Sequence, residues 1–464
     1  MLIYPGQVTY RELPPPQVDE ACMPPDLPQT VYTARLSRLL DAMAASGLHA
    51  AVIYGDREHG TNFGYFTGFE PRFEEGCLVV HQNGTAYALL GNENLKMHQF
   101  SRIPVTPIHV PWFSLPNQPM TGAKPMRESF AMAELHAGMR VGMIGWKLFA
   151  NTVDDGQLLF DAPHFIVQAV VDAITPGGSL QNATALMIHS GSGIRATAGV
   201  DEIAHYEYAA SLASRCVYRV MEAVGPGKTE MELAGLLNAM GQPLTCYSMC
   251  AAGERFSNAV VYPRNKAVAL GDRFTVSMGL RGGLTCRAGY VAYSDADLPI
   301  EVSDYMDAMA KPYFAATATW FSTVGLHVPG REVYGAVETV LPRNIYGWTL
   351  NPGHLTATEE WMSSPIDKTS DIPLRSGMIL QMDIIPRRPP YGGINAEDGV
   401  LLADDMLQAE LLEKYPDTFA RMRRRRSYMQ NVLGIPLKPE VLPMSDTVGY
   451  LRPLLLNRSK AFSI

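Results

Sequence analysis

The residues best suited to catalysis lie in the second half of the chain, beginning with Asn351-Pro352-Gly353-His354-Leu355. The imidazole of His354 can take up and release a proton near neutral pH. Asp383 and Glu397 would supply carboxylates that orient this ring or stabilise its cation. Two isoleucines follow Asp383, so we expect it in an apolar strand, where a carboxylate needs a partner or has a raised pKa. Together these side chains predict proton-transfer chemistry.

The second half of the chain also repeats one sequence plan twice. Pro226-Gly227 and Pro329-Gly330 each precede a helical segment and lie 103 residues apart. Gly271-Asp272 and Gly377-Met378 each lead into an apolar strand and lie 106 residues apart. Similar motifs in the same order at nearly the same offset indicate a duplicated unit. Two such units joined by a pseudo-twofold axis would form a curved sheet with helices outside, and we expect the catalytic groove on its concave face.

The first half of the chain alternates between helical and strand patterns. Apolar residues recur at helical spacing or form short runs bounded by turn residues. The expected elements are helices near 33–46, 126–137 and 164–173, strands near 50–54 and 140–145, and a hairpin of 76–80 and 86–90. This alternation predicts an α/β domain. We place that domain at residues 1–192 and the second domain at residues 193–464.

The composition limits the expected partners and compartment. Of 464 residues, 47% are hydrophobic and 18% are charged, and the formal net charge is −8. This balance gives no reason to expect nucleic acid or an anionic membrane as a partner. The arginine-rich run 421–426 is expected to be a solvated helix end or a dimer contact rather than a phosphate site. Neither a signal peptide, a membrane span nor disulfide-like cysteine spacing is recognisable, so we expect a cytoplasmic protein.

An ordered set of short motifs resembles the creatinase and Xaa-Pro aminopeptidase family, whose catalytic domain has the pita-bread fold. The resemblance covers nearly the whole chain, and in the first domain it lies in Asn62 to Gly68 followed by Arg72. In the second domain it lies in Gly225-Pro226-Gly227-Lys228-Thr229-Glu230, Gly271-Asp272, Gly353-His354, Ser376-Gly377-Met378 and Glu397-Asp398-Gly399-Val400-Leu401. The resemblance implies an α/β N-terminal domain plus an α+β pita-bread C-terminal domain with internal pseudo-twofold duplication.

The resemblance also implies a metal centre for which this chain lacks several ligands. Peptidase members hold two divalent metals with two Asp, one His and two Glu, and the matching positions here are Ser277, Cys286, His354, Asp383 and Glu397. Ser277 and Cys286 offer no carboxylate, although a hard dinuclear site needs several. We therefore expect no cofactor. A single divalent metal on His354, Asp383 and Glu397 is the alternative.

Creatinase-type members of the family hydrolyse a C–N bond with a His and carboxylates and no metal ion. This chain is similar to that branch because Ser277 replaces the peptidases' Asp. It departs from the pattern at Val260, which matches a proton-shuttling His and has no acid–base chemistry. The peptidases' second His matches the region 359–361.

The expected site comprises His354, Asp383 and Glu397 as catalytic residues and Arg287, Glu359, Glu360 and Arg72 for substrate binding. His354 would be the base or proton shuttle. Arg287 would polarise a carbonyl or bind a carboxylate bidentately, and Glu359 or Glu360 would hold an amine.

Several of these residues keep a structural alternative. The resemblance implies that Arg72 reaches a partner's groove across a dimer, whereas a local ion pair with Glu74 or Glu75 is equally consistent with the sequence. Glu397 beside a glycine also fits a solvated turn. Cys286 fits a small buried hydrophobe, or a thiol whose pKa Arg287 lowers.

Two functions follow from these residues. The first is a hydrolase that cleaves an amide, amidino or Xaa-Pro-like C–N bond in a small molecule or short peptide without a dinuclear metal centre. The second is an inactive relative that binds a small ligand or protein partner in the same groove. The resemblance implies a homodimer, with the Pro-rich first 30 residues and the tail from Gly434 to Ile464 as wrapping segments.

Overall fold

The structure is a computed structural model that describes residues 1–19, 23–150, 153–259 and 261–464. Val260 and Cys22 therefore lie outside the described residues. The chain separates into two compact units, one of Leu27–Ala196 and one of Met1–Asp26 together with Thr197–Ile464. The domain boundary expected after residue 192 stays a prediction.

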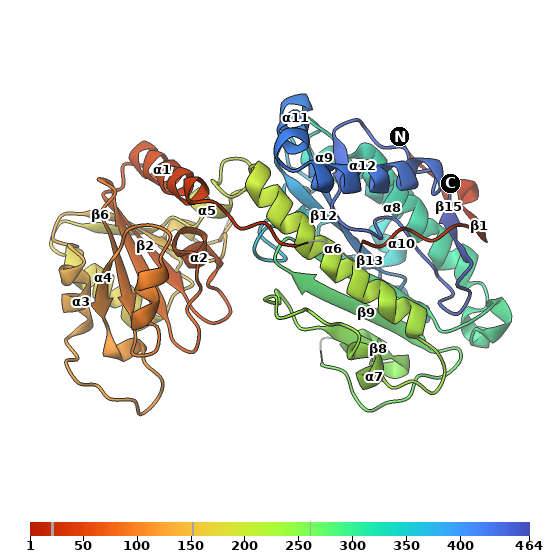
Figure 1. The fold of residues 1–464 in the computed structure, drawn as a ribbon, viewed down its shortest axis with the longest axis horizontal. Helices are drawn as coiled ribbons and strands as arrows, with labels where there is room; N and C mark the ends of the chain where they lie inside the picture. Colours follow the sequence, from red (N-terminus) through yellow and green to blue (C-terminus); the bar gives the residue numbers. More distant parts are fainter. Residues whose placement is uncertain (20–22, 151–152, 260) are drawn as a thin grey trace. The chain divides into compact units, whose positions relative to one another are not determined.

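The unit of residues 27–196 is built around a six-stranded sheet (Figure 1). Its elements are α1 (Gln29–Ala45), β2 (Ala50–Gly55), α2 (Thr61–Thr67), β3 (Gly76–His81), β4 (Ala86–Leu90), β5 (Thr106–His109), α3 (Met126–Met132), β6 (Arg140–Ile144), α4 (His164–Ile174), β7 (Ser179–Asn182) and α5 (Ala185–Ile188). The strand order is β5-β4-β3-β2-β6-β7, and β2, β6 and β7 run parallel. Buried Val52 on β2 joins Phe130 of α3 and Val170 of α4 in one apolar core. The expected α/β architecture is therefore present.

The motif from Asn62 to Gly68 lies in helix α2, whose C-terminal cap is Gly68, where φ is +76°. Asn62 of this helix donates to the Gly145 carbonyl at 2.6 Å and accepts from Arg195 at 2.7 Å, so its amide is used within the unit. Helix α3 stops at Met132 instead of continuing to residue 137, because Glu134 takes a left-handed conformation with φ of +61°.

The second unit carries the predicted pita-bread plan. Its elements are β1 (Thr9–Glu12), α6 (Val200–Ala223), α7 (Glu230–Ala234), β8 (Met249–Ala252), β9 (Arg273–Leu280), β10 (Gly283–Tyr290), α8 (Lys311–Thr323), α9 (Gly330–Val340), α10 (Arg343–Tyr346), β11 (His354–Leu355), β12 (Ile379–Asp383), β13 (Ala396–Leu402), α11 (Asp405–Lys414), α12 (Pro416–Asn431), β14 (Val441–Pro443) and β15 (Lys460–Ser463). Seven strands form one antiparallel sheet in the order β11-β12-β13-β10-β9-β8, with β14 beside β13.

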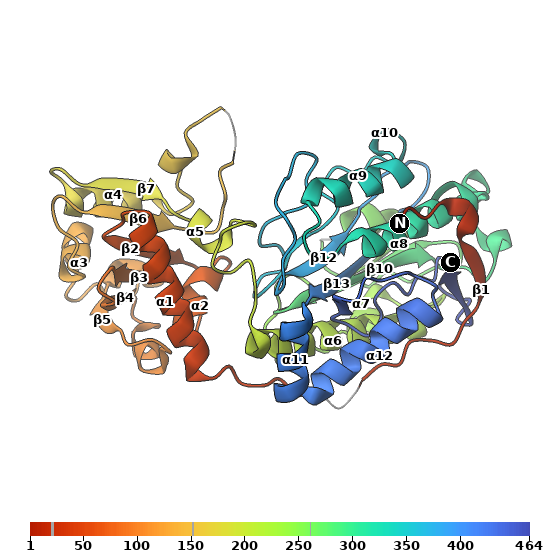
Figure 2. The same ribbon diagram turned by 90° about the horizontal axis from the view of Figure 1, so that it is seen from above.

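The duplication predicted from the sequence appears as one backbone pattern in both halves of this unit. Each half has a long helix, α6 or α8, followed by a tight turn and a second helix, α7 or α9 (Figure 2). Thr229 bridges to Ala267 in the first half, and Pro329 bridges to Pro373 in the second. Gly271 and Gly377 precede matching strands with φ values of +82° and +85°, which glycine tolerates because it has no Cβ.

Helices α6 and α8 cover one face of the sheet, with α6 against β9 and β10 and α8 against β12. A Cβ placed on Gly283 of β10 would lie 3.2 Å from the Cβ of Ala210 on α6. Alternate residues of a strand point to opposite faces. The odd-numbered side chains of β10 therefore face α6, and the even-numbered ones point to the other face.

The two segments expected to wrap a partner subunit pair with each other in this chain. β1 and β15 form a two-stranded antiparallel sheet in which Thr9 lies opposite Ser463. The backbone nitrogen of Ile3 also donates to Thr319 of α8 at 2.9 Å. Dimer formation itself stays a prediction.

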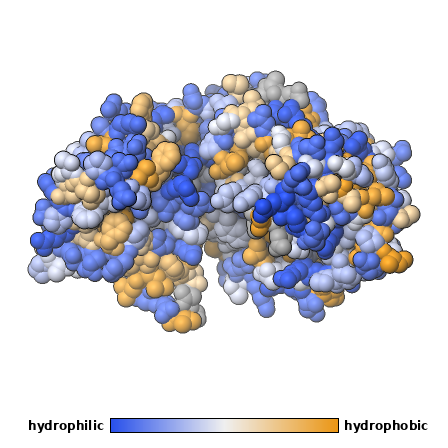
Figure 3. All heavy atoms as spheres, turned by 90° about the horizontal axis from the view of Figure 1, so that it is seen from below, coloured by the Kyte–Doolittle hydropathy of each residue, from blue (hydrophilic) through white to orange (hydrophobic). Residues whose placement is uncertain are grey.

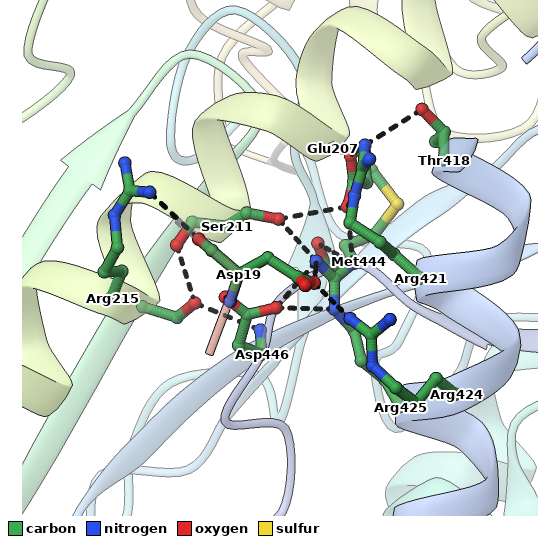
Figure 4. Close-up of polar contacts among 11 residues, drawn as sticks. Asp19, Glu207, Ser211, Arg215, Thr418, Arg421, Arg424, Arg425, Met444 and Asp446 are labelled. Carbon is green, nitrogen blue, oxygen red and sulfur yellow. Dashed lines mark hydrogen bonds and ion pairs between the residues drawn. The ribbon is translucent and has the colours of Figure 1, made fainter. Parts of the chain in front are cut away.

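The arginine-rich run lies inside α12, and most of its arginines are wholly or partly buried. Arg425 is 4% exposed and contacts Glu207 of α6 at 2.6 Å and Asp446 at 2.7 Å (Figure 4). Arg421 contacts the same Glu207 at 2.5 Å, and Arg424 pairs with Asp19. These arginines therefore join α6, the N-terminal segment and the chain after β14. The solvated-helix interpretation is wrong for Arg425 and Arg426, which are buried among acceptors from other segments, whereas Arg423 is exposed. A dimer contact by this run stays a prediction.

The face of the molecule in Figure 3 mixes hydrophilic and hydrophobic residues without a clear separation into two sides. Among the described residues, no helix is both long enough and apolar enough to cross a membrane.

We expect Arg425→Met to lower the free energy of unfolding by about 3–5 kcal/mol, because it leaves Glu207 and Asp446 buried with fewer cationic partners. The matched control is Arg423→Met, two residues away on the exposed side of α12, which should change the free energy of unfolding by less than about 0.5 kcal/mol. Urea unfolding of the three proteins measures both values. Equal stability of the two variants would contradict the structural role of Arg425.

Candidate functional site

The centre of the candidate site is a row of side chains that crosses the sheet of the second unit. Ser277 lies opposite Cys286, Cys286 lies opposite Glu397, and Glu397 lies opposite Asp383. Opposite residues of an antiparallel pair share a face, with Cβ atoms about 5 Å apart. All four side chains are buried and belong to the face that α6 does not cover. The sheet register therefore brings together four of the five positions that match metal ligands in the resemblance.

The carboxyl groups in this row retain protons more strongly than ordinary carboxyls. Burial and the nearby charge of Glu360 raise the pKa of Asp383 to about 7. Burial, Asp383 and Glu360 raise the pKa of Glu397 well above its ordinary value, and burial raises the pKa of Glu360. In the part of the chain that the structure describes, no Lys, Arg or His forms an ion pair with these three carboxyls. Loss of water without a compensating cation is thus the main cause of the shifts.

His354 lies on the same face of the sheet as this row. It pairs with Gln381 of β12, which is two residues before Asp383. Its ring is fully buried and stacks on Trp361 with 4.1 Å between ring centroids. Its Nδ1 contacts the Leu355 carbonyl at 3.1 Å, so Nδ1 carries the proton and Nε2 is the acceptor. Burial lowers the pKa of His354 to about 4, so the ring is neutral at pH 7. Nε2 has no hydrogen-bond partner among the described residues.

His354 is therefore oriented differently from the sequence-based expectation. Asp383 and Glu397 were expected to orient the ring, whereas Leu355 and Trp361 do so in the structure. The two carboxyls lie opposite each other on β12 and β13 instead, and Asp383 raises the pKa of Glu397.

Arg287 lies on the opposite face from the carboxyl row and is 1% exposed. It forms an ion pair of 2.8 Å with Asp398 and donates to the carbonyls of Tyr450 at 2.9 Å and Cys286 at 2.6 Å. Asp398 also accepts from the Gly449 nitrogen at 3.0 Å. This arrangement favours a structural role for Arg287 and not the substrate-binding role expected from the sequence.

Glu359 and Glu360 belong to the loop that follows β11. The loop is closed where the Leu355 nitrogen donates to the Ser363 carbonyl at 2.7 Å and the Met362 nitrogen donates to the Leu355 carbonyl at 3.0 Å. The Glu359 carbonyl accepts from the Ala357 nitrogen at 3.1 Å. The charge of Glu360 raises the pKa of Asp383 and of Glu397, so Glu360, rather than Glu359, is the residue that affects the site.

Arg72 belongs to the other unit and is half-exposed. Its guanidinium lies 3.6 Å from Glu70 and donates to the Arg57 carbonyl at 3.1 Å. Glu74, one of the two expected ion-pair partners, instead accepts from the backbone nitrogens of Glu93 and Asn94 at 3.0 and 3.1 Å. The local partner of Arg72 is thus Glu70.

The two thiols near the row are not activated nucleophiles. Burial and Glu397 raise the pKa of Cys286 well above its ordinary value, and they outweigh the opposing effect of Arg287. Burial, Glu360 and Glu397 raise the pKa of Cys246 to about 12. Both thiols are protonated near neutral pH, which favours the small buried hydrophobe expected as one alternative for Cys286.

Gln381 and Trp361 contact this site although neither was singled out from the sequence. Gln381 lies two residues before Asp383 on one strand, so period-two spacing places both on the same face. A polar residue at that spacing in an apolar strand was a usable signal. Trp361 gave no such signal, because its contact with His354 depends on how the loop folds back.

The donor set does not fit the two-metal centre of the peptidase members. Asp383 and Glu397 are the carboxylates of the ligand positions, and their raised pKa values mean that a cation would have to displace bound proton from the pair. Ser277 and Cys286 complete the row with a hydroxyl and a protonated thiol. Among the described residues, no group of three or more His, Cys, Asp and Glu is arranged to hold a metal ion.

We expect Asp383 and Glu397 to contribute a fall in the free energy of unfolding as the pH rises from 5 to beyond 7, whereas the lowered pKa of His354 contributes the opposite trend below about pH 6.5. Asp383 and Glu397 bind protons more tightly in the folded than in the unfolded chain, so raising the pH favours unfolding by up to about 1.4 kcal/mol per pH unit and group. Asp383→Asn removes one such group and should give a shallower slope in urea unfolding at several pH values. Glu413→Gln, at an exposed position of α11, should keep the wild-type slope. Identical slopes for all three proteins would refute the protonated pair.

Two family models match the chain, one within each of its two units. The creatinase/prolidase N-terminal domain matches residues 35–116, and metallopeptidase family M24 matches residues 204–404. Together these matches cover more than half of the chain. A comparison with curated proteins finds no match.

Solved structures share the fold at low sequence identity. An Xaa-Pro dipeptidase from Bacillus anthracis has 14% identity and a TM-score of 0.60, and the match covers 81% of this chain and 96% of that one. A recombinant prolidase from Thermococcus sibiricus has 18% identity and a TM-score of 0.63, with 80% and 95% covered. An X-Pro aminopeptidase from Thermotoga maritima has 14% identity and a TM-score of 0.59, with 80% and 95% covered.

The match to metallopeptidase family M24 supports a hydrolase of the creatinase and Xaa-Pro aminopeptidase type. The prolidase structures match the mixed α/β fold described above. With both domain models matched in order, the chain belongs to the creatinase and Xaa-Pro aminopeptidase family.

Proposed function

We propose that this protein hydrolyses a C–N bond in a small amide, amidino or Xaa-Pro-like compound without a dinuclear metal centre. The observation that carries the proposal is the pair Asp383 and Glu397, two buried carboxyls opposite each other with raised pKa values. Two adjacent carboxyls without a cationic partner cannot both ionise cheaply, so the pair holds one proton near neutral pH. One member is then a base and the other an acid.

The pair supplies both proton transfers that C–N hydrolysis needs. The ionised carboxyl removes a proton from water as the water oxygen bonds to the substrate carbon. The protonated carboxyl gives its proton to the leaving nitrogen as the C–N bond breaks. The pair still holds one proton afterwards, with the two roles exchanged.

Neutral His354 contributes an acceptor, because its unprotonated Nε2 lies on the same face and has no partner among the described residues. A conjugate-acid pKa of about 4 makes the ring a weaker base than the carboxyl pair near neutral pH. We therefore assign His354 to positioning the water or a substrate N–H group, and Glu360 to raising the proton affinity of the pair and holding a substrate amine.

A ligand-binding protein without turnover is the second candidate. Ser277 and Cys286 favour it, because both lie in the row but offer no base near neutral pH. The two candidates differ in turnover and not in binding.

Turnover is tested on a panel of Xaa-Pro peptides, creatine-like compounds and N-acyl compounds, with and without a strong chelator. We expect hydrolysis of at least one class at a rate that the chelator leaves unchanged, and His354→Ala should reduce kcat/KM. Metal analysis of the same preparation is the control. Tightly bound metal near one equivalent, with activity lost on its removal, would refute the metal-free mechanism, and tight binding without turnover would favour the second candidate.

The acid–base pair predicts a bell-shaped dependence of kcat on pH. Activity should fall as the pH rises above about 7, because the pair loses its shared proton, and should fall again in acid, where both members are protonated. Asp383→Asn and Glu397→Gln should each lower kcat by about 10²–10⁴-fold. Retained activity with an unchanged pH profile in Asp383→Asn would exclude the pair as the acid and base.

A further inference from the structure

A bulge in the chain before β8 lies beside the carboxyl row, and the mechanism above assigns it no role. Met249 of β8 pairs with Ser277 of β9, and farther along Leu244 bridges to Leu280. Between these two pairings the chain advances by five residues before β8, from 244 to 249, but by three residues on β9, from 277 to 280. Two extra residues therefore bulge out of the antiparallel ladder. We call residues 245–248 the strap.

The side chains of the strap lie on the same face of the sheet as the row. Gly279 follows Ser277 of the row by two positions on β9, so the two residues share a face. A Cβ added to Gly279 would stand 2.5 Å from Thr245 Oγ1 and 2.9 Å from Cys246 Sγ. Both distances are too short for such atoms, so only glycine lets the strap pack this closely on β9. Gly279 is therefore the position on which the strap rests.

The carboxyl row is closed to a ligand in the conformation described. Asp383 is 4% exposed, Glu397 is 7% exposed and His354 is fully buried. Cys246 of the strap is partly exposed, and burial and the nearby charges of Glu360 and Glu397 raise its pKa. Its thiol therefore lies between the buried carboxyls and solvent. A ligand can reach these carboxyls only after a covering segment has moved.

The loop after β11 covers the His354 end of the row and is tightly held. In addition to the two backbone bonds that close it, the Thr356 nitrogen donates to the Ile379 carbonyl of β12 at 3.1 Å. Thr358 Oγ1 also contacts the Tyr206 hydroxyl of α6 at 3.3 Å. Opening this loop would break these bonds together.

The strap is held by fewer bonds than this loop. Its Thr245 nitrogen donates to the Gly279 carbonyl at 3.1 Å. Among the described residues, the backbone nitrogens of Cys246 and Tyr247 donate to no carbonyl. Tyr247 is 71% exposed and Leu244, just before the strap, is 46% exposed, so little apolar surface is buried here. A segment with few buried contacts opens at a lower free energy than the core beneath it.

We propose that the strap is a gate that closes on Gly279 to cover the carboxyl row and lifts from β9 to admit a ligand. The inference rests on the proposed function in that the admitted ligand is the substrate of the carboxyl pair. In the closed state the strap excludes bulk water from the two proton transfers. In the open state the row is accessible from the β8 edge of the sheet.

The test locks the strap with a disulfide. In Gly279→Cys the added Cβ would lie 2.9 Å from Cys246 Sγ, close to the distance of about 3 Å between these atoms in a disulfide. Diamide, a thiol oxidant, removes one hydrogen from each thiol as the S–S bond forms, and mass analysis of the linked peptides verifies the bond. Gly279→Ser is the matched control, because it brings the same Cβ to the strap but cannot be cross-linked.

The first readout is labelling of Cys286, a thiol of the row, by methyl methanethiosulfonate, which does not depend on turnover. We expect Cys286 to label at least about tenfold more slowly in the cross-linked protein than in the wild type, since labelling of a buried group requires its cover to open, and dithiothreitol should restore the rate. Gly279→Ser should label at least as fast as the wild type, because its Cβ hinders closure. Cys77, fully buried in the other unit, is the internal reference and should label at one rate in all three proteins.

The second readout is hydrolysis of any compound that the wild type turns over, which cross-linking should abolish and reduction should restore. Equal labelling of Cys286 in the cross-linked and wild-type proteins overturns the gate, and so does failure of the disulfide to form in folded Gly279→Cys. Slower labelling in the cross-linked protein, with no compound hydrolysed by the wild type, supports the gate and counts against the proposed hydrolysis. The two failures are therefore distinguishable.

A third measurement uses the wild type alone and does not depend on the folding of a variant at position 279. The strap amides should exchange hydrogen for deuterium at least about tenfold faster than those of residues 355–363, since the loop after β11 is held by more bonds. Exchange of the two segments at equal rates would contradict the assignment of the strap as the part that moves.

Discussion

The antiparallel register of β10, β13 and β12 is the constraint on which the candidate site depends. Strand residues alternate between faces, so adjacent Glu397 and Asp398 point in opposite directions. Glu397 joins Asp383 and Cys286 on one face, and Asp398 pairs with Arg287 on the face that α6 covers. A shift of one residue in this register would exchange the two sets. The site is therefore specified by strand pairing before any single side chain contributes.

The two faces of the sheet differ in whether their buried carboxyl groups have a cationic partner. On the covered face, Arg287 compensates Asp398 and donates to several carbonyls, and Arg425 compensates Glu207 so strongly that, despite burial, the pKa of Glu207 lies below its ordinary value. On the other face, Asp383 and Glu397 are buried without a cation, and their pKa values rise. Paired charges join β10 to β13 and α12 to α6, whereas carboxyls without an ion-pair partner keep a proton available for chemistry.

Local sequence patterns predicted much of the fold. The hairpin expected at 76–80 and 86–90 is β3 and β4, and the helical segment expected after Pro329-Gly330 is α9. The helical segment expected after Pro226-Gly227 is α7, and its N-cap residue Thr229 accepts from the Glu232 nitrogen at 3.1 Å. These features depend on neighbours within a few residues, so spacing and turn residues are enough to reveal them. The arginine run was misjudged because its partner carboxylates Asp19 and Glu207 are distant in the sequence.

The sequence by itself determined the residue types of the site, with Ser277, Cys286, Asp383 and Glu397 in motif positions that imply the fold. Only the tertiary structure decided that Arg287 turns away, that Leu355 and Trp361 orient His354, and that Gln381 joins the site. Chemical type is a property of each residue, but pKa and orientation depend on desolvation and on partners from other strands. Those partners are brought together by strand register and loop closure, which a local pattern does not contain.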